Sequence, residues 1–161
     1  MLEVIDNRGN TVLHLAAAYN KYSLELLIET FREVIGSLLE LQNDNGSTVP
    51  YAAARWKPAS LELLIKAFPE KVAKLLEAQD KKGNTALHLA IKHNSAALKL
   101  LIKEFKEGIA SLIEIKNNDG GHSTALSYYT WSKSTKTLSR SISRESQKLT
   151  VSRKYARSNS V

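Results

Sequence analysis

The chain has 161 residues, of which 43% are hydrophobic and 24% are charged, and it contains no cysteine. This composition is too apolar for a fully disordered chain, and the length fits one domain or a short repeat array. The missing cysteines exclude disulfides, thiolate zinc sites and cysteine nucleophiles. No apolar run approaches the about 18 residues of a membrane-spanning helix, and the acidic N-terminus does not resemble a signal peptide. We therefore expect a cytoplasmic protein, either in the cell that makes it or in the cytosol of a recipient cell.

The net charge of +7 is concentrated at the C-terminal end. Residues 1–131 contain 15 basic and 15 acidic side chains, whereas residues 132–161 contain eight Lys or Arg and a single acid, Glu145. The chain therefore divides into a neutral body and a basic tail, and the charge gives no indication of a basic fold.

A repeat with a period of 37 residues runs through the body. Gly9, Gly46 and Gly83 keep this spacing, and a threonine follows each glycine after two residues. Such a fixed period is the signature of a stacked array. We predict an array over residues 1–131, with repeats at about 4–40, 41–77 and 78–115 and a degenerate fourth at 116–142. Residues 143–161 are predicted to be a disordered basic tail.

Each repeat is predicted to begin with a turn and a capped helix. The glycine and the Asp or Asn residues before it favour a turn with positive φ. The threonines stand where a helix N-cap is expected: Thr11, Thr48 and Thr85. The helices that follow are short and rich in alanine, which lets a neighbouring backbone approach closely. Their expected ends are Asn20, the Lys57-Pro58 step and Asn94.

Two further helices are predicted in each repeat. The first spans residues 23–31 and carries an apolar stripe at helical spacing, formed by Leu24, Leu27, Ile28 and Phe31. The second is a short helix at residues 33–41, 70–78 and 107–115. Its apolar residues in the first repeat are Val34, Leu38 and Leu41. We expect both stripes to form the core of the array.

The segments at residues 11–16 (Thr-Val-Leu-His-Leu-Ala) and 85–90 (Thr-Ala-Leu-His-Leu-Ala), each after Asp-x-x-Gly-Asn, resemble the ankyrin repeat motif Asp-x-x-Gly-x-Thr-Pro-Leu-His-x-Ala. The resemblance covers about residues 4–131 and implies an all-α, ankyrin-type helical repeat solenoid with β-turn fingers. The period is longer than the usual one of about 33 residues, and the second copy lacks the histidine. The motif's proline is replaced by Val12, Val49, Ala86 and Ala125. Such lengthened repeats resemble those of ankyrin proteins from intracellular bacteria.

The histidines are the residues for which catalysis or metal binding has to be considered. His88 and His93 are five residues apart and do not share a helix face, and His122 has no second ligand at metal-binding spacing. The resemblance instead implies hydrogen bonds across the turn and between repeats for a structural set, Thr11, His14, Thr85 and His88. No nucleophile motif or phosphate-binding loop is present. The sequence therefore predicts no enzyme, no metal and no cofactor.

Outward-facing positions at the end of the first helix predict a surface for a protein partner. In ankyrin arrays, to which the chain is similar, these positions and the turn tips line a concave face. Arg, Trp and Tyr are the residue types enriched at interface hot spots. The predicted partner-binding residues are Tyr19, Arg55, Trp56, Lys57, Lys92 and His93. The predicted rim consists of Arg8, Asn45, Lys81 and Lys82. The structural alternative is that Trp56 only covers the bend at Pro58.

The N-terminal end of the array has two interpretations. Only Leu2, Val4 and Ile5 precede the first turn as apolar residues, so one side of the first repeat is expected to be exposed. Either the chain is a fragment of a longer array, or another molecule covers that side.

The Ser/Arg/Lys-rich tail has three interpretations. A disordered linker is the simplest. A polybasic segment would bind anionic membranes or nucleic acid, although only Tyr155 offers an aromatic ring for base stacking. Ser143, three residues after Arg140, fits a phosphorylation pattern.

These observations favour a non-catalytic protein–protein interaction module that binds a protein partner through its concave face, with no small-molecule substrate. The alternatives are a recognition segment of a larger bacterial effector or enzyme, and an electrostatic anchor in which the tail binds membrane or nucleic acid.

Overall fold

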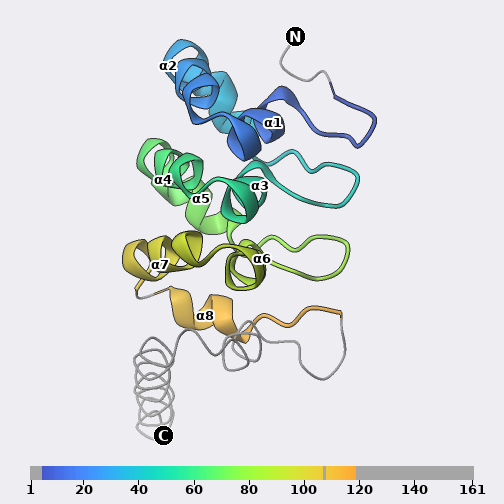
Figure 1. Ribbon diagram of the computed structural model, residues 1–161, viewed down its shortest axis with the longest axis vertical. Helices are drawn as coiled ribbons and strands as arrows, with labels where there is room; N and C mark the ends of the chain where they lie inside the picture. The colour runs from blue at the N-terminus through green and yellow to red at the C-terminus, as the bar shows by residue number, and fades with distance from the viewer. Residues whose placement is uncertain (1–4, 107, 119–161) are drawn as a thin grey trace, which may run out of the picture.

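The computed structural model describes residues 5–106 and 108–118 of the chain. These residues form the all-α repeat solenoid that the sequence predicts (Figure 1). The rest of the predicted fourth repeat, including its Trp131, and the tail at 143–161 lie outside the described residues. In the part of the chain that the structure describes, no helix combines the length and the apolar character needed to cross a bilayer. The helices are α1 (Val12–Tyr19), α2 (Lys21–Leu38), α3 (Val49–Trp56), α4 (Pro58–Ala67), α5 (Pro69–Leu75), α6 (Ala86–His93), α7 (Ser95–Glu104) and α8 (Ile109–Glu114).

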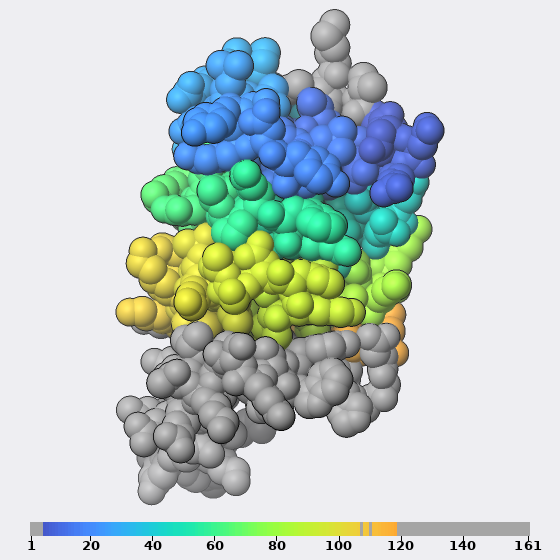
Figure 2. Space-filling model, viewed as in Figure 1, coloured from blue at the N-terminus to red at the C-terminus, as the bar shows by residue number. Residues whose placement is uncertain are grey.

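Equivalent elements of the repeats lie on top of one another. The inner helices α1, α3 and α6 form one layer, and the outer helices α2, α4 and α7 form a second (Figure 1). A turn projects from each repeat on the side away from the outer helices, and we call these turns the fingers. Figure 2 shows the repeats as successive slabs in contact with one another. The slabs share a continuous core of aliphatic side chains, in which Leu24, Leu61 and Leu98 occupy equivalent positions.

The three finger glycines hold positions that other residues would strain. Their φ angles are 70° for Gly9, 78° for Gly46 and 76° for Gly83, the left-handed region that suits glycine. The fingers also lie close together, since the Lys81 amide donates to the Asn45 carbonyl at 2.9 Å. A Cβ on Gly46 would lie 3.0 Å from that amide nitrogen. The glycines of the 37-residue period therefore set both the turn and the spacing of the fingers.

One residue joins the inner to the outer helix in each repeat. Asn20 ends α1 and also caps the start of α2, where its side-chain oxygen accepts from the Ser23 amide at 3.2 Å. Asn94 caps α7 in the same way through the Ala97 amide. Lys57 takes this place in the second repeat, and Pro58 follows as the first residue of α4. Proline suits that position because the missing amide hydrogen has no partner there in any case.

The predicted third helix is present in each described repeat, after a phenylalanine whose backbone is not helical. The φ and ψ angles are −131° and 36° for Phe31, −139° and 60° for Phe68, and −118° and 39° for Phe105. In the first repeat the third helix forms the last part of α2, and α5 and α8 are its equivalents in the second and third repeats.

The third helix buries the same positions in each described repeat. The predicted stripe of Val34, Leu38 and Leu41 is wrong for its two outer members, because Val34 is 50% exposed and Leu41 39% exposed. Ile35 and Leu39 are fully buried in their place, as are the equivalent Val72 and Leu76 of the second repeat. Residues 33–41 carry apolar side chains on two neighbouring helix faces, so the helical spacing did not decide which face is buried. Phe31 itself is also half exposed.

The first repeat exposes apolar residues that are covered in the others. Val12 is 40% exposed, whereas the equivalent Val49 and Ala86 are fully buried. Leu26 is 64% exposed, while Leu63 and Leu100 are partly buried. The described part of the chain thus leaves one side of the first repeat uncovered, as its sequence led us to expect.

Candidate protein-binding groove

A groove lies between the fingers and the inner helices, and it contains two hollows. The first hollow has a volume of about 200 Å³ and joins repeats one and two. The second has a volume of about 430 Å³ and joins repeats two and three. The first is lined by Arg8, Asn10, His14, Leu15, Ala18, Tyr19, Asn43, Asn45, Ser47, Tyr51, Ala52, Arg55 and Trp56. The second is lined by Asn45, Ser47, Tyr51, Arg55, Asp80, Lys81, Lys82, Asn84, His88, Leu89, Lys92 and His93. Tyr51 and Arg55 line both, so the two hollows form one continuous surface.

The first hollow has an apolar wall. Leu15 is 39% exposed and Tyr19 67% exposed, both on α1, and Trp56 on α3 is 53% exposed. These side chains stand in one hollow rather than singly on the surface. Grouped apolar exposure of this kind marks interaction sites more often than scattered apolar residues do.

Arg55 and Trp56 form a pair where the two hollows meet. The Arg55 guanidinium carbon lies 4.7 Å from the centre of the Trp56 ring, within the range of a cation–π contact. The Arg55 Nε is buried and has no hydrogen-bond partner among the described residues. A buried donor without a partner costs about 1–3 kcal/mol. The groove thus contains a fixed guanidinium with one unused donor.

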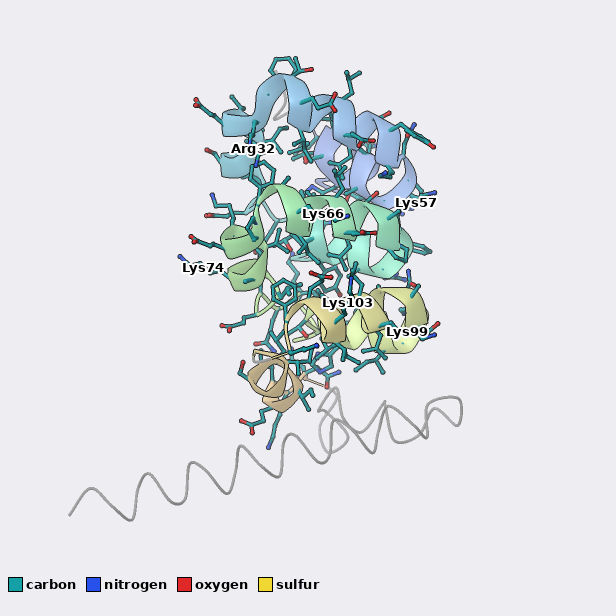
Figure 3. The ribbon with its side chains drawn as sticks, turned by 90° about the vertical axis from the view of Figure 1, so that its left-hand side faces the viewer. Arg32, Lys57, Lys66, Lys74, Lys99 and Lys103 are labelled. Atoms are coloured by element: carbon teal, nitrogen blue, oxygen red, sulfur yellow. The ribbon has the colours of Figure 1, made fainter. Side chains whose placement is uncertain are left out.

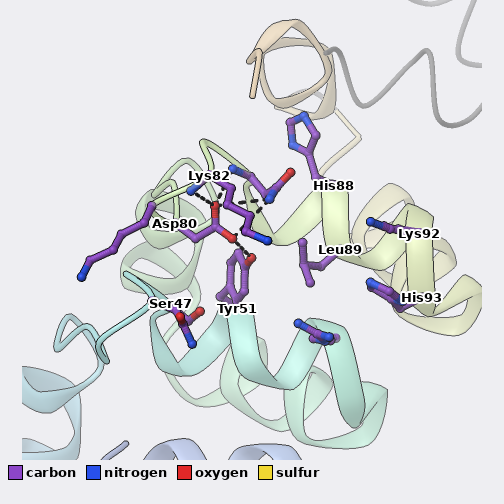
Figure 4. Close-up of a pocket in the computed structure, with 12 residues that line it drawn as sticks. Ser47, Tyr51, Asp80, Lys82, His88, Leu89, Lys92 and His93 are labelled. Carbon is purple, nitrogen blue, oxygen red and sulfur yellow. Dashed lines mark hydrogen bonds between the residues drawn. The ribbon is translucent and has the colours of Figure 1, made fainter. Parts of the chain in front are cut away.

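The second hollow is lined mainly by positive charge. Arg55, Lys81, Lys82 and Lys92 all line it, with Asp80 as its single acidic residue. Figure 4 shows Lys92 and His93 beside each other on α6, across from Tyr51 and Asp80. Partial burial lowers the pKa of His93, and the positive charges of Arg55 and Lys92 lower it further. The positive potential that disfavours protonation of His93 would attract a negatively charged group of a ligand.

Asp80 is the acceptor of several internal hydrogen bonds. Its Oδ1 accepts from the Lys82 amide at 2.9 Å and from the Asn84 amide at 2.8 Å. Its Oδ2 accepts from the Tyr51 hydroxyl (Figure 4). Burial raises the pKa of Tyr51, and the bond to the Asp80 carboxylate raises it further. The carboxylate is therefore held inside the second hollow by donors of its own chain.

The structural set of Thr and His residues makes the contacts expected for a repeat interior. Thr11 and Thr85 are N-caps, and each forms a capping box with the histidine three residues on. His14 Nδ1 lies 2.8 Å from the Thr11 hydroxyl oxygen, and His14 Nε2 lies 2.9 Å from the Ser47 carbonyl oxygen of the next repeat. Both ring nitrogens of His14 are thereby used within the fold. Thr48 is also an N-cap but makes no capping bond.

The groove includes most but not all of the residues predicted to contact a partner. Tyr19, Arg55, Trp56, Lys92 and His93 line the hollows, as do all four rim residues. Lys57 lines neither, because it starts α4 and Figure 3 shows it from the side of the outer helices.

Sequence reasoning missed two groups of lining residues. Leu15 and Ala18, which lie on the same helix as Tyr19, were not among the predicted partner-binding residues. Tyr51 was noted only as a lost histidine, although a phenol at the histidine position can reach further than an imidazole.

No three His, Cys, Asp or Glu side chains in residues 5–106 and 108–118 gather closely enough to hold a metal ion. The features of the groove that can bind a ligand are its shape, its aromatic residues and its positive charge.

The ankyrin repeat family model matches residues 8–43 and 82–111. The chain therefore contains ankyrin repeats. The two matched stretches fall on the first and third repeats, and the second, with Pro50 and Tyr51 in place of the motif residues, lies between them. No curated protein sequence gives a significant match.

Ankyrin repeats are generally protein–protein interaction modules, and the family is typically non-catalytic. The ankyrin array of this chain has the groove in the place where its sequence predicts one, between the fingers and the inner helices. The positive charges and aromatic side chains that line this groove are the features that can determine what it binds.

Proposed function

We propose that this protein is a non-catalytic binding module that holds a protein partner in the groove, with Arg55 and Trp56 at the centre of the contact. The observation that carries the proposal is the position of this pair where the two hollows meet. A tryptophan and an arginine fixed against each other bury a large area at little cost in side-chain entropy. Residues of these types dominate the energy of measured interfaces.

The alternative role of Trp56, covering the bend at Pro58, accounts for less. A residue that only covers a bend would be buried by it, whereas Trp56 keeps 53% of its surface exposed. It also lines the first hollow beside Tyr19, which belongs to the neighbouring repeat. Two exposed aromatic side chains from neighbouring repeats that line the same hollow support a role in binding.

A non-catalytic role is supported by how the reactive groups of the groove are used. His14 bonds through both ring nitrogens to its own fold. The Asp80 carboxylate accepts from Tyr51, Lys82 and Asn84. General acid–base catalysis needs such a group within reach of a substrate proton, and these two groups are engaged elsewhere.

The test is quantitative affinity capture from cell lysate with the full chain as bait. The variant Arg55→Ala/Trp56→Ala removes the central pair. The control Lys21→Ala/Tyr22→Ala removes another cation–aromatic neighbour pair, 5.9 Å apart, which lines neither hollow. We expect partners held by the wild type and the control to be lost from the groove variant by at least about tenfold, a typical hot-spot effect.

Salt separates this proposal from an anchor through the basic tail. At about 1 M salt, charges more than about 3 Å apart are screened, so a tail-mediated contact is lost while an aromatic contact persists. Partners that stay equally bound to Arg55→Ala/Trp56→Ala would contradict the proposal. Thermal unfolding of both variants checks that neither has lost the fold.

A further inference from the structure

We infer that the groove selects an extended acidic protein segment, with an aromatic or aliphatic side chain that enters the first hollow and carboxylates that face the second. The inference rests on the proposed function and names the chemistry of the partner. It follows from the different linings of the two hollows and from Arg55 between them.

The first hollow fits an apolar anchor. Its volume of about 200 Å³ exceeds the about 150 Å³ of an apolar cavity that binds benzene. Its wall includes the exposed faces of Leu15, Tyr19 and Trp56. A ring placed there can stack against Trp56 or Tyr19 at the distances that aromatic pairs prefer.

The second hollow fits carboxylates. The two hollows together are lined by five Lys or Arg residues and one acid, Asp80. The donors of Tyr51, Lys82 and Asn84 already occupy that acid. The five cations outnumber the single carboxylate, so the groove keeps a net positive charge for a ligand, and charge complementarity of this kind determines partner choice and association rate.

The cations of the groove differ from those of the outer helices. Ion pairs between described residues use Lys21, Lys66, Lys71 and Lys103, on α2, α4, α5 and α7. Arg55, Lys81 and Lys82 are in none of these pairs. Their charge is thus not neutralised by a described carboxylate in direct contact.

Arg55 is the specific recognition element. Trp56 holds its guanidinium in place at 4.7 Å, and its Nε is buried without a partner in the described part of the chain. A carboxylate can accept from two guanidinium nitrogens at once, in a geometry that a lysine cannot match. An acidic side chain in the groove would pair with the guanidinium of Arg55, which lines both hollows, and would also lie beside the anchor.

The polarity of the groove favours a protein segment over nucleic acid. A nucleic acid strand carries one charge per nucleotide and needs cations along its whole path. Here the three lysines are concentrated in the second hollow, while the first has Arg8 and the shared Arg55 beside Leu15, Ala18 and Tyr19 of α1. An acidic peptide with an apolar anchor matches a surface whose positive charge is concentrated at one end.

The test is a selection of random displayed peptides, about 16 residues long and hence able to extend across several repeats, on the immobilised full chain. We expect enriched peptides to combine several Asp or Glu residues with an aromatic or large aliphatic residue. One enriched peptide is then synthesised, and its affinity is measured by fluorescence anisotropy at about 0.1 M salt.

Two pairs of charge reversals give the matched comparison. Lys81→Glu/Lys82→Glu changes the rim of the second hollow, where both side chains are exposed. Lys74→Glu/Lys99→Glu makes the same change in net charge on exposed lysines of α5 and α7, which Figure 3 shows on the side of the outer helices. We expect the groove variant to lose at least about tenfold in affinity and the control less than about threefold, because close charges act much more strongly than screened ones.

Each other outcome overturns the inference in a distinguishable way. Enriched peptides that are neutral or basic, yet lost with Arg55→Ala/Trp56→Ala, would refute the acidic partner and leave the proposed function intact. Peptides that bind Arg55→Ala/Trp56→Ala as well as the wild type would refute both. Tighter binding of single-stranded oligothymidine than of the peptide, lost with Lys81→Glu/Lys82→Glu, would make the groove a nucleic-acid site. A failure to enrich any peptide would refute an extended partner.

Discussion

The two junctions between the described repeats are held by different side chains at the same repeat position. Three residues after the finger threonine, the first repeat has His14, which bonds to the backbone carbonyl of Ser47 in the next finger. The second repeat has Tyr51 there, which bonds to the Asp80 carboxylate of the next finger. Both side chains are almost fully buried, at 1% and 5% exposure.

The comparison shows that the stacking geometry is more constant than the chemistry that maintains it. A neutral imidazole and a neutral phenol each donate one hydrogen bond to the following repeat. They differ in titration, since burial lowers the pKa of His14 and raises that of Tyr51. Mild acid is therefore expected to act on His14 and not on Tyr51, although both keep the hydrogen that they donate to the next repeat.

The largest expected effect comes from the backbone that both junctions share. Gly9→Ala would place a Cβ 2.9 Å from the Asp44 amide, and Gly46→Ala would place one 3.0 Å from the Lys81 amide. In each variant the alanine loses about 1–2 kcal/mol because its backbone is held in the left-handed region. The close contact of the added Cβ costs at least about 1 kcal/mol more. We expect urea unfolding to show a loss of about 2–3 kcal/mol for each variant.

Gly108→Ala is the control for this prediction. Gly108 has a negative φ, and the nearest atom to an added Cβ lies at 4.0 Å. It should change stability by less than about 1 kcal/mol. Amide hydrogen exchange of Lys81, which bonds to Asn45, should accelerate in Gly46→Ala. An unchanged Gly46→Ala would show that the fingers do not depend on each other's spacing.

Tyr51→Phe sharpens the comparison by removing only the second junction's donor. The Asp80 Oδ2 would keep only the longer 3.3 Å contact with the Asn84 side chain. Hydrogen bonds to charged groups contribute about 1.5–3 kcal/mol, so we expect a loss near the lower end of that range in urea unfolding. Tyr22→Phe is the matched control, because Tyr22 is 80% exposed and should change nothing. A fully stable Tyr51→Phe would mean that packing of the ring alone holds this junction.

The sequence predicted the elements that its period repeats and missed those that break it. The finger glycine and the threonine after it occur in each of the three copies, so the fingers and the inner helices could be placed from the 37-residue spacing. Only the second repeat has a tyrosine at the position of Tyr51, and its partner Asp80 is 29 residues away in the sequence. No local sequence pattern connects the two residues. Val34 was predicted as core because residues 33–41 carry apolar side chains on two neighbouring helix faces, and the structure buries the other one, with Ile35 and Leu39. Lys57 follows Trp56 directly, but it stands between α3 and α4 and lines neither hollow.

The groove could be predicted in position but not in polarity. Aligning the copies places Arg55 and Trp56 between Tyr19 and His93, because the inner helices stack in register. The grouping of Leu15, Tyr19 and Trp56 in one hollow and of three lysines in the other depends on which side chains the fold uses internally. The occupation of Asp80 by donors of its own chain is an example that spacing does not reveal.

The smallest expected effect is the response of the first junction to pH. His14 Nε2 must carry a hydrogen to donate to the Ser47 carbonyl, so Nδ1 is free to accept from the Thr11 amide at 3.3 Å. Burial lowers the pKa of His14 below its ordinary value of about 6.5, although the Ser47 carbonyl, the Asp6 carboxylate and the Leu41 carbonyl oppose the shift. Protonation in the folded state would replace the accepted bond at Nδ1 with a second donor in a buried site.

The sign of the effect follows from which state binds the proton first. Below pH 6.5 the unfolded chain protonates His14 while the folded chain still holds it neutral, so stability falls as the pH falls towards the folded pKa. The slope cannot exceed about 1.4 kcal/mol per pH unit for one proton. Urea unfolding of the wild type and of His14→Gln, measured at about pH 7.5, 6.5 and 5.5, isolates this contribution from the other titrating groups. We expect the wild type to lose more stability on acidification than His14→Gln. Equal losses would show that His14 takes up its proton at no cost to the folded state, and the His14 and Tyr51 positions would then respond alike to pH.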